Sequence, residues 1–232
     1  MMPNFTSSGR DVSAAGADSS PQAPDFLISE SGPLSRAARS RGYRRFTEVA
    51  EVVRALPYGR VQDSEDVLAV LKEGKGTCSS KHRFLVALAH ECGHAEVQLV
   101  LALYEMSEKN TPVVGNVLRM EQLSAIPEAH CYLTYEGRRF DFTGLAAAAA
   151  SPFESLIEER VVSPTDLPST KLAYHRHAIE LWARAHGMDP DRAWTIRERC
   201  ITLLASSTPH SDARASAARS DGPSARIGGR ER

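Results

Sequence analysis

The stretch 96–104, EVQLVLALY, constrains the fold of this chain more than any other segment. Apolar residues occupy both sides of its alternating pattern, which predicts a strand that is central in its sheet and covered on both faces. Two more strands are predicted at 130–135 and 138–143, joined by a turn at Glu136-Gly137. Helical spacing of apolar residues is found before and after these strands, at 43–56, 64–73, 77–92, 171–186 and 190–204. Helices, then strands, then helices indicate an α+β fold.

Composition predicts disorder at both ends of the chain. Residues 1–24 and 206–232 are rich in Ser, Ala, Gly, Asp and Pro, and the second segment adds arginine. Such segments bury too little apolar area to offset the entropy of the chain. One folded domain is therefore expected at 25–205.

Charge and hydropathy exclude several functional classes. The chain has 28 basic and 29 acidic residues and a net charge of −1. This balance gives no electrostatic reason to expect a nucleic-acid or membrane partner. No apolar run approaches about 18 residues, and the first thirty residues lack a signal-peptide core. Four scattered cysteines are expected to be free thiols in a reducing compartment, so we expect a cytoplasmic protein.

Cys78 stands where a thiol becomes reactive. The turn Gly74-Lys75-Gly76 precedes it, and a well-patterned helix is predicted to begin at Thr77. The unpaired N–H groups of a helix start favour a thiolate and can receive a developing oxyanion. A small buried cysteine is the alternative explanation for this position.

The predicted hairpin offers a base and a residue to orient it. With a two-residue turn, Cys131, Leu133 and Phe140 share an apolar face that should pack inward. The opposite face is polar and is expected to line an opening. It carries His130, Tyr132, Thr134, Arg139, Asp141 and Thr143. On that face Asp141 is the diagonal neighbour of His130, near enough for the two side chains to meet.

The order of these residues resembles a known family. Gly76-Thr77-Cys78 opening a helix, followed by a strand and then by His130 and Asp141 on adjacent strands, resembles the transglutaminase-like core of the papain-like cysteine superfamily. The resemblance covers roughly residues 65–143. It implies a nucleophile helix packed on a small antiparallel sheet, here with extra C-terminal helices. It also implies Cys78 as nucleophile, His130 as general base and acid, and Asp141 as the residue that orients His130.

The resemblance implies a cysteine-dependent hydrolase or acyltransferase that acts on an amide bond in a peptide or small amide. No cofactor is expected. Tyr58 and Gln62 are candidate oxyanion donors, and Arg139 and Tyr132 are candidate substrate-binding residues. The long connection 105–129 departs from the family pattern, and we expect it to form an ordered loop over the cleft.

Two alternatives remain open. The first is a metal site, because Cys78 and His82 are spaced i, i+4 and further Cys and His residues follow. The predicted helix 77–92 argues against it, since its two ends lie about 21 Å apart and cannot share one ion.

The second alternative is a non-catalytic binding module on the same fold. Leu181, Trp182 and Trp194 in the C-terminal helices would form its binding stripe if they were exposed. Core packing is the commoner role, and the shared helical face of Leu172, Ile179 and Trp182 favours it. A buried Cys78, or a His130 that points away from it, would favour the binding module.

Overall fold

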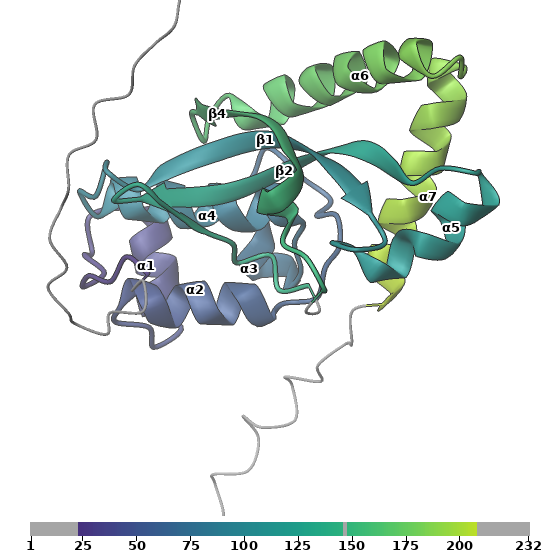
Figure 1. The fold of residues 1–232 in the computed structure, drawn as a ribbon. Coiled ribbons are helices and arrows are strands. Elements are labelled where there is room, and N and C mark those ends of the chain that lie inside the picture. The colour runs from purple at the N-terminus through teal and green to yellow at the C-terminus, as the bar shows by residue number, and fades with distance from the viewer. Residues whose placement is uncertain (1–22, 146–147, 208–232) are drawn as a thin grey trace, which may run out of the picture.

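The computed structural model describes residues 23–145 and 148–207. The tails expected at 1–24 and 206–232 therefore lie outside the described residues, except at their inner ends, where residues 206–207 complete the last helix. Within the described part the architecture is mixed α+β, with seven α-helices and one four-stranded antiparallel sheet (Figure 1). No helix in this part is long and apolar enough to cross a membrane.

The sheet has the order β3-β2-β1-β4. Its strands are β1 (Gln98–Ser107), β2 (Ala125–Tyr135), β3 (Arg138–Phe140) and β4 (Leu156–Val162). Strand β1 has a neighbour on each side and six consecutive buried residues, so the prediction of a central covered strand is confirmed.

The predicted hairpin register is also confirmed. Tyr135 pairs with Arg138 and Leu133 pairs with Phe140. The turn residues Glu136 and Gly137 have φ of 50° and 72°, the left-handed pair that a two-residue hairpin turn requires. Strand β3 ends at Phe140, so Asp141 lies just beyond the paired residues.

Four helices precede the sheet. They are α1 (Pro33–Arg39), α2 (Phe46–Ala55), α3 (Ala69–Glu73) and α4 (Cys78–Glu91). The helix expected at 64–73 is shorter than predicted because Asp63 accepts hydrogen bonds from the backbone N–H groups of Glu65 and Asp66. This local turn competes with helix formation, so the helix starts only at Ala69.

The connection 105–129 does not form a loop over the cleft, and that prediction is wrong. Strand β1 continues to Ser107, a 3-10 turn and helix α5 (Gly115–Met120) follow, and β2 begins at Ala125. Val114 and Leu118 of this segment are buried in the same cluster as Ile196 of the last helix. The segment therefore packs against the C-terminal helices.

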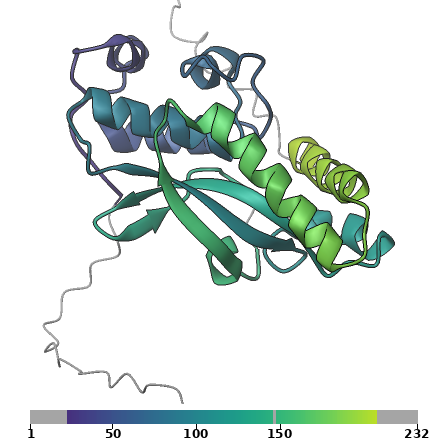
Figure 2. The same ribbon diagram turned by 90° about the horizontal axis from the view of Figure 1, so that it is seen from above.

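Two apolar clusters hold the layers together. In the first, Leu88 of α4 packs with Leu101 of β1 and Leu133 of β2. In the second, Met106 and Ile126 of the sheet pack with the C-terminal helices α6 (Leu167–Ala185) and α7 (Pro190–Ser207). Figures 1 and 2 show α1–α4 gathered on one side of the sheet, with α6 running over it and α7 at one end. The start of α6 thereby comes close to the start of α4.

Candidate active site

Cys78 is the first residue of α4, as predicted. The residues before it are fixed by backbone pairing, because Gly76 donates to the carbonyl of Pro57 and accepts from the N–H of Gly59, at 3.1 and 3.3 Å. Thr77 is the N-cap, and its N–H donates to the hydroxyl of Ser80 at 3.0 Å. The helix start thus holds Cys78 in one place with unpaired N–H groups beside it.

The side chains of His130 and Asp141 meet, as the alternation of side chains along the hairpin predicts. His130 Nε2 lies 2.7 Å from Asp141 Oδ2. The other oxygen, Oδ1, accepts the N–H of Thr143 at 2.8 Å. Since Nε2 is held by the carboxylate, Nδ1 is the nitrogen of this imidazole that remains for Cys78.

Electrostatics favour an ion pair between Cys78 and His130. Hydrogen bonding from Cys131, and then the charges of Lys171 and His130, hold the pKa of Cys78 well below its usual value against the opposing effect of burial. For His130, burial lowers the pKa, but the negative charges of Asp141 and Cys78 outweigh this effect and raise the pKa to about 10. The charge of His130 keeps the pKa of Asp141 low although burial raises it. A thiolate beside an imidazolium is the reactive form of a cysteine nucleophile.

His82 connects the nucleophile to the Asp141 segment, a role that the sequence did not reveal. Its Nδ1 donates to the carbonyl of Cys78 at 2.8 Å, and its Nε2 accepts the N–H of Phe142 at 2.7 Å. The ring is fully buried, and burial lowers its pKa, so it is a neutral imidazole with both nitrogens in use. This excludes His82 as a metal ligand in the observed arrangement.

Lys81 makes a second connection. Its ammonium is buried and donates to the carbonyls of Leu56 and Thr143 at 2.6 and 2.7 Å, and to that of Arg54 at 3.3 Å. Burial lowers the pKa of Lys81 to about 8. The end of α2, the start of α4 and the residues after Asp141 are therefore joined by one side chain.

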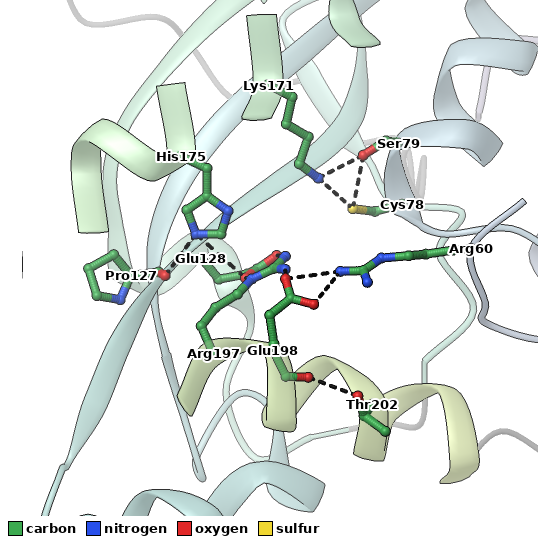
Figure 3. A network of polar contacts seen from close by, with 10 residues as sticks. All are labelled: Arg60, Cys78, Ser79, Pro127, Glu128, Lys171, His175, Arg197, Glu198 and Thr202. Atoms are coloured by element: carbon green, nitrogen blue, oxygen red, sulfur yellow. Dashed lines mark hydrogen bonds and ion pairs between the residues drawn. The ribbon is translucent and has the colours of Figure 1, made fainter. Parts of the chain in front are cut away.

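Lys171 of α6 lies against the nucleophile, and no local pattern in the sequence pointed to it. Its Nζ is 3.4 Å from Cys78 Sγ and 2.7 Å from the hydroxyl of Ser79 (Figure 3). Burial lowers the pKa of Lys171, but nearby negative charge, chiefly that of Cys78, raises it by more, so the amine is an ammonium. The nucleophile thus has a cationic neighbour besides His130.

A pocket of about 550 Å³ opens next to this cluster. Its walls are the segment 58–64, the first turns of α4, the start of α6 and one face of α7. Thr77, Ser79 and Lys171 are among the residues that line it, so the pocket reaches the residues on either side of Cys78. A concave site with an apolar lining and a few polar groups is the usual form of a small-molecule site.

The polar face of the hairpin is closed at His130 and Tyr132, whereas Thr134 and Arg139 of the same face line a separate pocket of about 560 Å³. His130 is 7% exposed and Tyr132 is fully buried, with Phe153 packed edge-on against the Tyr132 ring at 4.8 Å. The chain between β3 and β4 covers this face. The access side of the site is instead at the start of α4, although Cys78 itself is only 3% exposed beneath Lys171.

The four weaker candidates divide into two pairs. Tyr58 is buried in the pocket wall, where burial and the charge of Cys78 raise its pKa, and Gln62 is exposed on the same wall. Tyr132 and Arg139 are not in this pocket, because both side chains bond to Glu159 of β4. Their predicted contact with a substrate held at Cys78 therefore has no support from their position, although Arg139 lines a separate pocket.

The two alternatives fare differently. In the described ranges, no group of three or more His, Cys, Asp or Glu residues is arranged to hold a metal ion. The apolar face predicted on α6 is only partly buried, since Ile179 is buried while Leu172 is 56% exposed at the pocket. The burial of Cys78 favours a binding module. The position of His130 does not, because His130 interacts with Cys78 and does not point away from it.

All four cysteines are unpaired. No family model, curated protein sequence or solved structure matches this chain. The functional conclusion therefore depends on the geometry of the site.

Proposed function

We propose that this protein is a cysteine-dependent hydrolase or acyltransferase that acts on an amide bond through Cys78, His130 and Asp141. The observation that carries the proposal is the position of His130, whose ring bonds to Asp141 at 2.7 Å and interacts with Cys78 at the first residue of α4. A nucleophile, a base and an orienting group in this relation are the parts of a catalytic triad. The chain order of the three residues supports membership of the transglutaminase-like superfamily, which is part of the proposal.

Each residue has a defined role in the mechanism. The Cys78 thiolate attacks the amide carbonyl carbon and forms a C–S bond, and the carbonyl electrons move to its oxygen. The N–H groups at the start of α4 stabilise this oxyanion. When the intermediate collapses, the C–N bond breaks and His130 Nδ1 gives its proton to the leaving amine.

The second half of the reaction frees the enzyme. Water or an acceptor amine loses a proton to His130 Nδ1 as it attacks the thioester carbonyl carbon. The C–S bond then breaks and Cys78 leaves as a thiolate. Asp141 holds Nε2 throughout, so the ring keeps one orientation and its positive charge is stabilised.

A non-catalytic binding module is the second candidate, and the burial of Cys78 favours it. In that case the cluster around Cys78 would be a structural polar network beside a ligand pocket. The two candidates differ in one measurable property, the reactivity of the Cys78 thiol at low pH.

Cysteine alkylation tests the proposal. Intact protein is treated with iodoacetamide between about pH 5 and 9, and each cysteine peptide is quantified by mass. The half-buried Cys92 serves as the internal reference. We expect Cys78 to react faster than Cys92 below pH 7, and His130→Ala to abolish this advantage while the control His94→Ala retains it. An inert Cys78, or one that titrates like an ordinary thiol near pH 8.5, would remove the catalytic proposal in favour of the binding module.

The proposal includes a cytoplasmic location, which the four unpaired thiols support because a reducing compartment preserves them. Its substrate class is a peptide or small amide. No cofactor has a role in the mechanism above.

A further inference from the structure

The pocket beside Cys78 is rich in positive charge. Arg60, Arg83, Lys171 and Arg197 line it, against the single carboxylate of Glu198. Two of these cations are already neutralised. Figure 3 shows Arg60 paired with Glu198, at 2.7 Å, and Arg197 bonded to Glu128 through two contacts of 2.6 and 2.7 Å.

The other two cations donate hydrogen bonds only to uncharged oxygens or to the nucleophile. Arg83 is 7% exposed and donates to the carbonyls of Ser64 and Pro164. Lys171 donates to Ser79 and Cys78. Among the residues that the structure describes, neither forms an ion pair with a carboxylate. Lys171 is the one of the two that contacts the nucleophile, so an anion in the pocket would be stabilised beside it.

Acylation makes this imbalance larger. In the resting enzyme the Cys78 thiolate is the anionic neighbour of Lys171 at 3.4 Å. When Cys78 becomes a thioester it loses its negative charge, and the half-buried ammonium is left without that partner. An uncompensated charge in such a place is costly. A negative group supplied by the substrate would remove the cost.

We propose that the pocket binds the part of the substrate that carries a carboxylate close to the scissile amide, and that Lys171 holds this carboxylate. The inference rests on the proposed function, since it assumes that Cys78 is the nucleophile. Leu172, Trp194 and Ile201 supply apolar walls for the body of the same group. An amide whose acyl group carries a second, free carboxylate is a substrate of this class.

Distances limit how far the carboxylate lies from the reacting bond. A charge-assisted hydrogen bond places its oxygen about 2.8 Å from Lys171 Nζ. Since Nζ lies 3.4 Å from Cys78 Sγ, that oxygen is no more than about 6 Å from the sulfur. The carboxylate therefore stands within a few bonds of the carbonyl that the sulfur attacks, on the acyl half of the substrate that stays bound to the sulfur.

Two matched reagents test the inference in the intact protein. Iodoacetate and iodoacetamide transfer a similar group to the thiolate with loss of iodide, but only iodoacetate carries a carboxylate. The ratio of their rates at Cys78 cancels changes in the thiolate fraction, because both reagents attack the same thiolate. We expect Lys171→Met to lower the iodoacetate-to-iodoacetamide ratio by about tenfold or more. Lys171→Arg should retain most of the ratio, because it keeps the charge.

The control is Lys75→Met, which removes a lysine three positions before Cys78 that is paired with Glu73. It should leave the ratio unchanged. Lys171→Gln is a second neutral variant, and circular dichroism checks that each variant is folded.

The outcomes separate the two proposals. If iodoacetamide labels Cys78 rapidly but Lys171→Met leaves the ratio unchanged, the carboxylate site is excluded and the catalytic proposal stands. A fall in both rates by the same factor assigns Lys171 to thiolate stabilisation alone and also overturns the inference. If Cys78 is inert to iodoacetamide, the proposed function fails and the inference fails with it.

Discussion

His82 donates its Nδ1 proton to the carbonyl of Cys78 at 2.8 Å, so the nucleophile is linked to a side chain one turn further along its own helix. The other ring nitrogen accepts the N–H of Phe142, the residue after Asp141. One neutral imidazole therefore fixes the distance between the helix start and the carboxylate of the candidate triad. This contact explains how residues on separate elements are held in register without a covalent link.

His82→Ala should destabilise the protein by about 3 kcal/mol, because it leaves the Phe142 N–H buried without an acceptor and creates a cavity. Urea denaturation of the variant against wild type measures the difference. His94→Ala, at a side chain about one-third exposed, is the control and should cost far less. An equal effect of the two variants would contradict the connecting role of His82.

The same pair of proteins gives a pH test. Burial lowers the pKa of His82 from 6.5. As the pH falls below 6.5, the unfolded chain therefore binds a proton at His82 more readily than the folded chain does. The stabilisation by neutral His82 is present above about pH 6.5 and is lost as the pH falls below that value. The stability difference between wild type and His82→Ala should therefore shrink between about pH 6.5 and pH 5.

Asp141→Asn should raise the pH at which Cys78 becomes half reactive by about 1–3 units. The carboxylate supports the imidazolium of His130, and the imidazolium in turn supports the thiolate. The midpoint of the iodoacetamide rate profile measures the change. Glu159→Gln serves as the control, since that carboxylate bonds Tyr132 and Arg139 away from Cys78, and it should leave the midpoint in place.

The His130–Asp141 pair should also give stability a defined pH window. The pKa of His130 is raised from 6.5 to about 10, so its contribution is complete below pH 6.5 and is lost as the pH rises through 10. The pKa of Asp141 is lowered from 3.8, so its contribution is present above pH 3.8 and is lost in acid. The stability lost in Asp141→Asn, followed by urea denaturation, should therefore be largest between about pH 4 and 6.5. A difference that does not vary with pH would exclude the ion pair.

The parts of the site that follow local rules were predictable. A helix start after Gly74-Lys75-Gly76 fixes Cys78, and the period of two along a strand places His130 and Asp141 on one face. The buried strand β1 was predictable because its sequence has no polar face. Each of these features depends on residues close together in the chain.

The missed parts depend on packing between distant segments. Lys171 reaches Cys78 from 93 residues further along the chain, and no periodicity encodes that approach. Strand β4, Leu156–Val162, has charged residues at its centre, and its edge position leaves them exposed, so it lacks the apolar pattern of a strand. Tyr132 on the polar hairpin face is covered because Glu159 of this strand bonds both Tyr132 and Arg139. Without β4 in the prediction, that face was expected to be open.

The buried pair of Glu128 and Arg197 joins β2 to α7 two residues before His130. Both side chains are less than one-tenth exposed. Glu128→Gln removes the carboxylate that makes two contacts with the buried arginine and leaves it only Glu198, at 2.6 Å, so it should cost about 3 kcal/mol of stability. The double variant Glu128→Gln/Arg197→Met should cost less than the sum of the two single changes, because neither charge then remains alone.

An exposed pair provides the comparison for this experiment. Glu108 and Arg119 form an ion pair in which both side chains are more than half exposed. Glu108→Gln should cost no more than about 1 kcal/mol in the same urea denaturation series. If Glu128→Gln costs equally little, the pair does not anchor α7 to the sheet.

Gly76 is the position where the backbone before Cys78 has no space for a side chain. A Cβ there would lie 2.8 Å from side-chain atoms of both Val70 and Lys81. Gly76→Ala should therefore destabilise the protein by about 1–3 kcal/mol through overpacking, and slow the alkylation of Cys78 by shifting the helix start. The matched control is Gly59→Ala, at the glycine whose N–H donates to the Gly76 carbonyl, where the nearest atom, in Lys75, is 3.5 Å away, an ordinary contact. The two glycines are hydrogen-bonded to each other. A similar loss of stability in both variants would therefore assign the effect to backbone flexibility and not to the lack of space beside the nucleophile.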